Sequence, residues 1–236
     1  MHSAPPAYRT VVVERLTRVY GATRALAGVS VTFRAGEVAV VEGGNGAGKS
    51  TLLSVLSSLA RPTAGEVRWG EYVMPDDRDL IRASLGLVAH ESLLPPDLSP
   101  RESLGLMAAL YGLRASDVVE RALAAVGLSE IADRPARTFS RGQLQRLALA
   151  RATLHDPTLL LFDEPTTGLD AASVARLERF IADARARRRI VVVVTHDPAF
   201  AARVADVRVT LERGRVRATE RVERASTPPP GGGTQA

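Results

Sequence analysis

Continuous apolar runs of strand length occur at three places in the chain. They cover residues 37–43 (EVAVVEG), 158–162 (TLLLF) and 190–195 (IVVVVT). A strand that is buried on both faces of a parallel sheet has this near-continuous pattern. The three runs therefore predict the inner strands of a parallel sheet.

Apolar residues at helical spacing follow two of these runs. After Lys49, leucines recur on one side of a predicted helix, at Leu52, Leu53, Leu56 and Leu59. Within 171–187 the helical positions are Val174, Leu177 and Ile181, and Asp170 stands where an N-cap is expected. Buried strands that alternate with amphipathic helices predict an α/β fold.

Residues 91–150 have a different pattern, that of helices without strands. The segment SPRE at 99–102 has the residues of a capping box with a helix-starting proline. The helix that it opens is expected to end at Gly112, and a second helix to run from about Ser116 to Gly127. We therefore predict a helical subdomain inserted into an α/β core.

A glycine-rich loop joins the first predicted strand to the first predicted helix. Residues 43–50 (GGNGAGKS) match G-x-x-x-x-G-K-[ST] in full. Glycines let the backbone fold around phosphate, and the helix N-terminus adds partial positive charge. The lysine of this motif reaches the β- and γ-phosphates, and the next hydroxyl ligates Mg²⁺. The candidate phosphate-binding residues are Gly43, Asn45, Gly46, Gly48, Lys49, Ser50 and Thr51, with Ser50 also a metal ligand.

Lys49 is the only lysine among the 31 basic residues of the chain; all the others are arginines. Drift in an arginine-rich composition would leave such a survivor by chance. The alternative is that this position requires a compact ammonium on a flexible stem, which a planar guanidinium cannot imitate. The motif around Lys49 favours the second interpretation.

Candidate catalytic groups follow the other two buried runs. Asp163 and Glu164 come directly after the run at 158–162, and His196 follows the run at 190–195. Nucleotides bind at the carboxyl ends of the strands in such sheets. We expect Asp163 to hold Mg²⁺ with its waters, Glu164 to polarise the attacking water, and His196 to contact the γ-phosphate.

A second phosphate-binding helix start is predicted in TFSRGQLQRLALARATLHDP. Ser140, Gly142 and Gln143 stand at the start of this helix, where a hydroxyl and a glycine N–H favour an anion. One nucleotide could contact both helix starts of the same chain. We favour a head-to-tail dimer, in which the partner completes each site.

Length, composition and net charge limit the classes of protein and of partner that fit this chain. With 236 residues the chain has room for one α/β domain, and none of its apolar runs approaches the roughly 20 residues that span a bilayer. The absence of cysteine excludes disulfides and thiolate metal sites, and fits a cytosolic address. The net charge is +5, but the arginines are spread along the chain, so we expect no nucleic-acid partner. A basic surface beside anionic lipid fits at least as well.

The motifs, in their order, resemble those of ATP-binding cassette (ABC) transporter ATPases over about residues 10–222. GGNGAGKS is similar to the Walker A loop, FSRGQ to the LSGGQ signature, LLLFDE to Walker B, and TGLD, with Asp170, to the D-loop. The resemblance implies a P-loop NTPase fold of the ABC type with an inserted helical subdomain. It also implies that His196 is the switch histidine and that Tyr20 stacks on adenine. A buried tyrosine at a strand end is the other interpretation of Tyr20.

One position departs from the family pattern. Where the family has a glutamine that contacts Mg²⁺ and the attacking water, this chain has His90, followed by Glu91. Neutral imidazole can also hydrogen-bond a water, which would make His90 a tolerated substitution in the catalytic site. The segment GLVAH and the run FSRGQLQRLALARATLHDP also resemble the haem-exporter ATPases of cytochrome c maturation.

The resemblance implies ATP and Mg²⁺ as cofactors and a cycle driven by dimerisation. Two subunits would close on two ATP molecules, moving the coupling helices of transmembrane permease subunits, and hydrolysis would reopen the dimer. The protein would then lie in the cytoplasm, on the inner face of the membrane. We expect a flexible N-terminus at 1–9, an ABC ATPase domain at 10–225 with its helical subdomain at about 91–150, and a disordered tail at 226–236.

The resemblance leaves other functions within and outside transport open. The ATPase of another exporter, for drugs, lipids or polysaccharides, is the first alternative. Soluble ABC proteins that act on ribosomes or DNA commonly have two cassettes or a coiled-coil insertion, for which this chain has no room. An importer ATPase with a regulatory C-terminal domain is disfavoured, because the fold is expected to end near residue 222.

Overall fold

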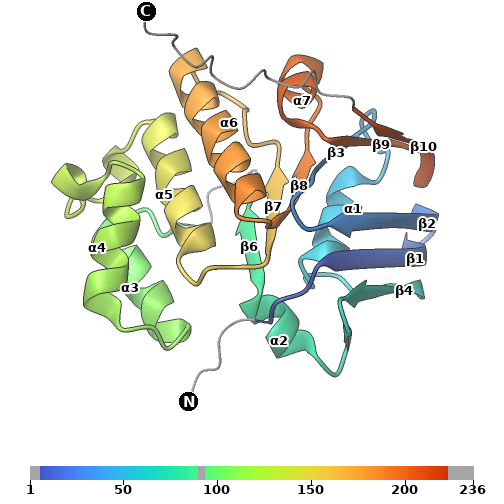
Figure 1. Ribbon diagram of the computed structural model, residues 1–236, viewed down its shortest axis with the longest axis horizontal. Helices are drawn as coiled ribbons and strands as arrows, with labels where there is room; N and C mark the ends of the chain where they lie inside the picture. Colours follow the sequence, from blue (N-terminus) through green and yellow to red (C-terminus); the bar gives the residue numbers. More distant parts are fainter. Residues whose placement is uncertain (1–5, 90–93, 223–236) are drawn as a thin grey trace, which may run out of the picture.

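The computed structural model describes residues 6–89 and 94–222, whose strands form two sheets (Figure 1). The larger sheet has the order β10-β9-β3-β8-β7-β6, and the smaller has the order β2-β1-β4-β5. The strands of the larger sheet are β3 (Val38–Glu42), β6 (Leu85–Val88), β7 (Leu159–Asp163), β8 (Ile190–Val194), β9 (Val207–Glu212) and β10 (Arg215–Arg221). Those of the smaller sheet are β1 (Thr10–Tyr20), β2 (Thr23–Arg34), β4 (Ala64–Trp69) and β5 (Tyr72–Val73).

The three predicted inner strands are confirmed as β3, β7 and β8. β8 pairs in parallel with β3 on one side and with β7 on the other, and all five of its residues are buried. In this register Val194 lies opposite Val41 and Asp163. The three strands therefore end at the same level, so the residues that follow them meet at one edge of the sheet.

Seven α-helices belong to the described residues. They are α1 (Lys49–Leu56), α2 (Arg78–Ala83), α3 (Pro100–Leu110), α4 (Ala115–Ala125), α5 (Arg141–Thr153), α6 (Ala171–Ala186) and α7 (Pro198–Val204). Figure 1 shows α1 on one side of β7 and β8, and α5 with the other helices of 100–153 on the opposite side. Within the described ranges, every helix is too short or too polar to cross a membrane.

The helix after Lys49 is shorter than predicted, and its expected apolar side is wrong at Leu59. α1 ends at Leu56, and Ser58 adopts a left-handed φ of 58°, which turns the chain away from the helix axis. Leu52, Leu53 and Leu56 are buried as expected, but Leu59 lies beyond the turn and is 65% exposed. Leu59 therefore has the spacing of a buried helical position, although the helix ends before it.

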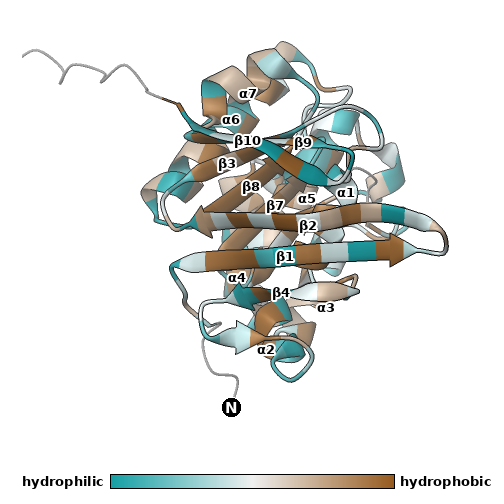
Figure 2. Ribbon diagram, turned by 90° about the vertical axis from the view of Figure 1, so that its right-hand side faces the viewer, coloured by the Kyte–Doolittle hydropathy of each residue, from teal (hydrophilic) through white to brown (hydrophobic). Residues whose placement is uncertain are grey.

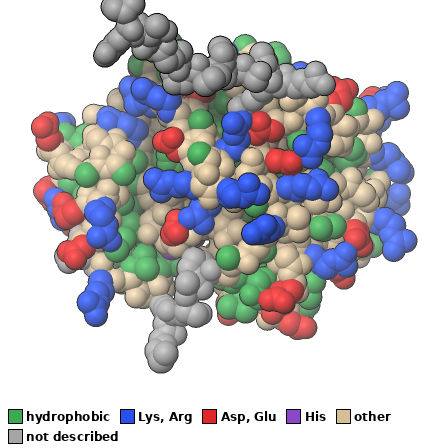
Figure 3. Space-filling model, in the orientation of Figure 1, with side chains coloured by type: hydrophobic (Ala, Val, Ile, Leu, Met, Phe, Trp, Pro, Cys, Tyr) green, Lys and Arg blue, Asp and Glu red, His purple; other side chains and the backbone are tan. Residues whose placement is uncertain are grey.

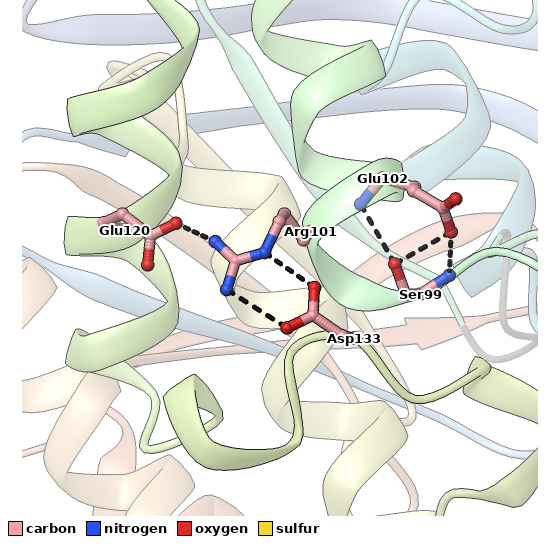
Figure 4. Close-up of polar contacts among 5 residues, drawn as sticks. All are labelled: Ser99, Arg101, Glu102, Glu120 and Asp133. Atoms are coloured by element: carbon pink, nitrogen blue, oxygen red, sulfur yellow. Dashed lines mark hydrogen bonds and ion pairs between the residues drawn. The ribbon is translucent and has the colours of Figure 1, made fainter.

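The stretch 94–153 contains helices and short 3-10 turns but no strand among its described residues. The predicted capping box is present: the Ser99 hydroxyl accepts from the Glu102 N–H, and the Glu102 carboxylate accepts from the Ser99 N–H (Figure 4). The neighbouring Arg101 donates from one guanidinium to Glu120 of α4 and to Asp133. One side chain therefore ties α3 to α4 and to the segment after it.

The smaller sheet was not predicted from the sequence. In β1 the residues Val11, Val13 and Leu16 are buried, with exposed or partly exposed residues between them. The pairing of β1 with β2 shifts register at three places, which interrupts the two-residue alternation of a half-buried strand. In Figure 2, which is coloured by hydropathy, β1 and β2 show both hydrophilic and hydrophobic residues and lie in front of the apolar strands β3, β7 and β8.

Residues 6–9, which belong to the segment expected to be flexible, contact the rest of the protein. Tyr8 is 8% exposed, and its hydroxyl lies 2.9 Å from the Ser84 hydroxyl oxygen. The Thr158 hydroxyl donates to the carbonyl of Pro6 at 2.7 Å. Burial raises the pKa of the Tyr8 phenol. One aromatic side chain thus anchors a proline-rich segment whose composition suggested disorder. Residues 1–5 and the predicted tail at 226–236 lie outside the described residues.

A buried histidine joins the helical part of the chain to the larger sheet. The His155 ring stacks on Tyr111 of the α3 C-terminus, with ring centroids 3.9 Å apart and planes within 6°. Its Nε2 lies 2.8 Å from the Leu85 carbonyl of β6. Burial lowers the pKa of His155 to about 4, although the contacts with Leu85 and Asp156 oppose that shift. His155 is therefore neutral, and its Nε2 donates.

Replacing Gly86 by alanine should destabilise the protein, because a Cβ there would lie 2.2 Å from the Ala152 carbonyl oxygen. We expect a loss of about 1–3 kcal/mol in the free energy of unfolding, as for other overpacked cores. Gly105→Ala is the control: a Cβ at that helical position meets nothing within 4 Å, so it should add about 0.5–1 kcal/mol. Urea denaturation measures both, and equal effects would contradict the packing of α5 on β6.

The stability should fall between about pH 6.5 and pH 4 through His155. The unfolded chain takes up a proton near the ordinary pKa of 6.5, whereas the folded chain does so only near 4. This contribution is complete above pH 6.5 and decreases as the pH falls. Between pH 7 and pH 5 the free energy of unfolding should decrease in both proteins. The decrease should be about 2 kcal/mol smaller in His155→Gln than in the wild type. Parallel losses in urea titrations at the two pH values would contradict a buried neutral His155.

Candidate functional site

The glycine-rich loop follows β3 at the edge where β7 and β8 also end. Within it, the Lys49 ammonium donates to the carbonyls of Gly43 at 2.7 Å and Gly44 at 3.2 Å. Lys49 is only 9% exposed, whereas Asn45, Gly46 and Ser50 are exposed. The loop thus folds around its own lysine and presents its other groups to solvent.

Two other segments hold the backbone of this loop in place. The Gly214 N–H, in the turn between β9 and β10, donates to the Ala47 carbonyl at 3.0 Å. Gly48, with a φ of 103°, lies against β2, where a Cβ would come within 2.6 Å of the Ala25 carbonyl oxygen. Only glycine fits this left-handed, closely packed position. Both sheets therefore contact the loop, and its shape is fixed by tertiary contacts.

Glu164 and His196 form a direct pair at the same edge. The Glu164 Oε2 accepts from the His196 backbone N–H at 3.2 Å and lies 2.8 Å from its Nδ1. Glu164 has a left-handed φ of 47°, and its N–H donates to the Val194 carbonyl at 2.9 Å. Its side chain is 17% exposed, against 70% for that of His196. This strained backbone turns the carboxylate toward the end of β8, where the histidine orients it.

Asp163 and Ser50 offer oxygen atoms suited to a hard divalent cation. Asp163 is the last residue of β7 and is partly buried, while Ser50 is an exposed residue at the start of α1. Mg²⁺ in phosphate sites takes one or two protein oxygens and keeps several waters. The described residues contain no cluster of three or more acidic or histidine side chains that could enclose a metal. A hydroxyl and one carboxylate therefore fit Mg²⁺ held mainly by waters and phosphate.

Tyr20 is 46% exposed at the end of β1, which excludes the interpretation of a buried strand-end tyrosine. It pairs with Thr23 across the β1–β2 turn, and β2 continues to Ala25, which touches the loop at Gly48. The Arg18 guanidinium lies 4.3 Å from the Tyr20 ring centroid. One ring face is thus covered by a cation, and the exposed ring stands on the hairpin that contacts the loop.

The predicted second helix start forms a separate group. Ser140 and Gln143 make a capping box: the Ser140 hydroxyl accepts from the Gln143 N–H, and the Gln143 amide oxygen accepts from the Ser140 N–H at 2.8 Å. Asp170 caps α6 as predicted, accepting from the Ser173 N–H at 2.7 Å. A Cβ on Gly142 would lie 2.7 Å from the Ser173 hydroxyl oxygen. The starts of α5 and α6 therefore pack closely together.

The structure thus places the predicted residues in two groups. The loop at 43–51, Asp163, Glu164 and His196 gather at the carboxyl edge of the larger sheet, with Tyr20 on the adjoining hairpin. Ser140, Gly142, Gln143 and Asp170 lie at the starts of α5 and α6, on the far side of β7 and β8 from α1 (Figure 1). His90 and Glu91 lie outside the described residues.

Two contacts of the site were not predicted. Arg18 stands two residues before Tyr20 on β1, a spacing at which a regular strand puts both side chains on one face, although the pairing with β2 shifts register between Arg18 and Val19. Gln145 of α5 donates to the Pro165 carbonyl, in the turn directly after Glu164, at 3.2 Å. That contact joins residues 20 apart through the packing of a helix on a loop, and nothing local in the sequence indicates it.

Lys49→Arg should weaken ATP binding although the charge is kept. The ammonium is nearly buried between two carbonyls, and a guanidinium is larger and has its donors in a fixed plane. We expect the Kd for ATP, measured by calorimetry, to rise about tenfold or more, which corresponds to about 1.4 kcal/mol. Arg61→Lys, an exchange at an exposed position, is the control. If Lys49→Arg bound ATP with wild-type affinity, the single lysine would be explained by drift in composition and not by a requirement of the site.

Comparison with known proteins shows what this chain is similar to. A cytochrome c biogenesis ATP-binding export protein, CcmA of Gluconobacter oxydans, is 40% identical over 191 residues, which are 80% of this chain and 82% of that protein. CcmA of Sodalis glossinidius is 34% identical over 201 residues, 85% of this chain and 95% of that protein.

Solved structures agree in fold. The ATP-binding subunit of an ABC transporter superposes with a TM-score of 0.83 at 29% identity, covering 90% of both chains. The dimeric bacterial ABC transporter cassette MJ0796 gives 0.82 at 29% identity, covering 91% of this chain and 100% of that chain. The family profile described as ABC transporter matches residues 26–167, more than half of the chain. The chain therefore belongs to the ABC transporter family, as an ATP-binding subunit with the ABC ATPase fold.

Proposed function

We propose that the chain binds ATP and Mg²⁺ at the carboxyl edge of the larger sheet and hydrolyses ATP there to drive export. The loop at 43–51 would surround the phosphates, with Lys49 exchanging its two carbonyl partners for β- and γ-phosphate oxygens. Tyr20 would stack on the adenine through the ring face that Arg18 leaves open. Its exposure and its place on the hairpin beside Gly48 support this role.

Ser50 and Asp163 would hold the Mg²⁺. When bound there, the metal would supply positive charge to the phosphate oxygens at which negative charge develops. The chain's own contribution is the spacing of the two oxygens, set by the start of α1 and the end of β7.

The observation that carries the catalytic proposal is the Glu164–His196 pair. A water would attack the γ-phosphorus and pass a proton to the Glu164 carboxylate as the bond to the bridging oxygen of ADP breaks. Because His196 holds Oε2, the second carboxylate oxygen is left to orient the water. His196 would contact the γ-phosphate through its exposed ring, and His90 would assist at the water.

We propose that the second group of residues acts on the nucleotide of a second copy. Ser140, Gly142 and Gln143 stand at the start of α5. Of the first N–H groups of this helix, the capping box satisfies that of Gln143. The N–H groups before it point out of the helix end, where they favour an anion. Two copies arranged head to tail would each complete the other's site, with Asp170 of the D-loop at the contact. MJ0796, 29% identical, was solved as a dimer, which supports this arrangement.

The transport role proposed is export in cytochrome c biogenesis, with haem as the cargo and transmembrane permease subunits as partners. The names of relatives at 34–41% identity support this role. The protein would then lie in the cytoplasm against the inner face of the membrane. No nucleic-acid partner is proposed. The ATPase of an exporter for drugs, lipids or polysaccharides is the second candidate, since the site itself fits any cargo.

A pull-down tests the transport role. Glu164→Gln protein would be incubated with ATP and gently solubilised native membranes, and its partners identified by mass spectrometry, with an ATP-free sample as control. Haem-handling maturation proteins are the expected result. Recovery of an unrelated permease would contradict haem as the cargo but still support a transport role. Recovery of ribosomal or DNA-bound partners alone would overturn the transport role.

Glu164→Gln should lower the rate of ATP hydrolysis by about 100-fold or more while the Kd for ATP stays within about twofold. The amide keeps the size of the side chain but cannot accept the proton of water. Phosphate release and calorimetry measure the two quantities. Glu130→Gln, on an exposed turn far along the chain from the sheet edge, is the matched control. Retained hydrolysis in Glu164→Gln would remove Glu164 from the role of general base.

A further inference from the structure

A pocket of about 260 Å³ lies at the starts of α5 and α6. Three arginines line it: Arg141, the first residue of α5, Arg146 on the same helix, and Arg176 on α6. Asp170 is the one acidic residue among the described residues that line it. The pocket therefore has an excess of positive charge. Basic side chains are also frequent across the middle of the face drawn in Figure 3.

Neutral partners hold two of these cations in place. Arg146 donates to the carbonyls of Val126 at 3.2 Å and Gly127 at 2.8 Å, at the end of α4. Arg176 donates to the Ser173 hydroxyl at 2.7 Å. Burial, and then the nearby charge of Arg176, lowers the pKa of Arg146. Within the ranges that the structure describes, none of the three guanidinium groups is in an ion pair with a carboxylate. Hydrogen bonds from Ser173, and then the charge of Arg176, lower the pKa of Asp170, so the Arg176 charge is partly offset within the pocket. The charges of Arg141 and Arg146 are available to an anion.

Arg141 has a position that only a glycine opposite it allows. A Cβ on Gly168, which has a φ of 69°, would lie 2.5 Å from Arg141 Nη1 and 2.7 Å from its Cζ. The guanidinium therefore crosses from α5 over the turn before α6 and rests on the backbone of Gly168. Arg141 itself is exposed, so its charge stands at the rim of the pocket. In the LSGGQ signature that FSRGQ resembles, this position is a glycine without charge.

The pocket does not serve the loop of its own chain. That loop is contacted by β2 and by the β9–β10 turn, and α1 lies across β7 and β8 from α5 (Figure 1). We propose that Arg141 contacts the triphosphate of ATP bound to a second copy of this chain, adding a cation from the partner to that of Lys49. This proposal rests on the proposed function, because it requires the head-to-tail dimer. It adds a binding residue to the site that Ser140 and Gly142 form.

The affinity of the ATP-dependent dimer tests the proposal. In the Glu164→Gln background, Arg141→Ala should raise the dimer Kd, measured by light scattering with ATP, about tenfold or more, which corresponds to about 1.4 kcal/mol. The Kd for ATP at concentrations where the protein is monomeric should stay unchanged. Arg141→Lys should restore part of the dimer affinity, and Arg121→Ala, which removes an exposed arginine of α4 outside the pocket, should have no effect.

Mixed dimers decide which copy Arg141 serves. Because the chain has no cysteine, Glu130→Cys allows one copy to be labelled with a donor and the other with an acceptor. The first pair combines Arg141→Ala with Lys49→Ala, and the second combines the Arg141→Ala, Lys49→Ala double variant with a copy that has both residues. Each pair has one loop that binds ATP, but only in the first does that loop face an intact Arg141. Energy transfer should therefore indicate the tighter dimer in the first pair.

The outcomes separate the two levels of proposal. Wild-type dimer affinity in Arg141→Ala, or equal affinities in the two mixed pairs, would overturn the role of Arg141 and leave the dimer standing. Tighter association in the second pair would place Arg141 on the ATP of its own chain and overturn the proposal likewise. If the Glu164→Gln parent forms no dimer with ATP, the head-to-tail arrangement fails, and the role of Arg141 fails with it.

Discussion

The parallel register of β8 between β3 and β7 is the constraint on which the site depends. All five residues of β8 are buried, so the candidate groups at this edge come from the last residue of β7, Asp163, and from the residues that follow the strands. Because Val194 lies opposite both Val41 and Asp163, those residues emerge at one level. The phosphate loop, the carboxylates and His196 are neighbours for this reason, although they are far apart in sequence.

The second functional region lies at the starts of α5 and α6, which line a pocket of their own. The start of α5 is set by the packing of helices at 100–153, and α6 follows β7 with Asp170 as its N-cap. Two local capping interactions order that region, together with two contacts between α5 and the segment that leads into α6: Gly142 with Ser173 and Arg141 with Gly168. The proposed head-to-tail pair of copies would bring this surface to a phosphate loop.

Sequence patterns predicted the features in which local residues decide the outcome. The apolar runs located β3, β7 and β8, and the predicted caps at Ser99 and Asp170 are formed by residues within three positions of each other. The capping box of Ser140 was not predicted, although it is equally local. The smaller sheet was missed because register shifts in β1 interrupt its alternation. Tyr8 and the contact of Arg141 with Gly168 depend on segments 76 and 27 positions away, and no local pattern encodes such partners.

The Lys49 ammonium makes two hydrogen bonds within its own loop, to the carbonyls of Gly43 and Gly44. A ligand that engages the ammonium either accepts its third N–H or competes with these two carbonyls. A neutral oxygen offers the ammonium no more than the carbonyls that it loses, whereas an ionised phosphate oxygen makes a bond about twice as strong. The hydrogen bonds of Lys49 within its own loop would therefore favour an ionised phosphate over an uncharged metabolite, independently of any contact with the base or the ribose.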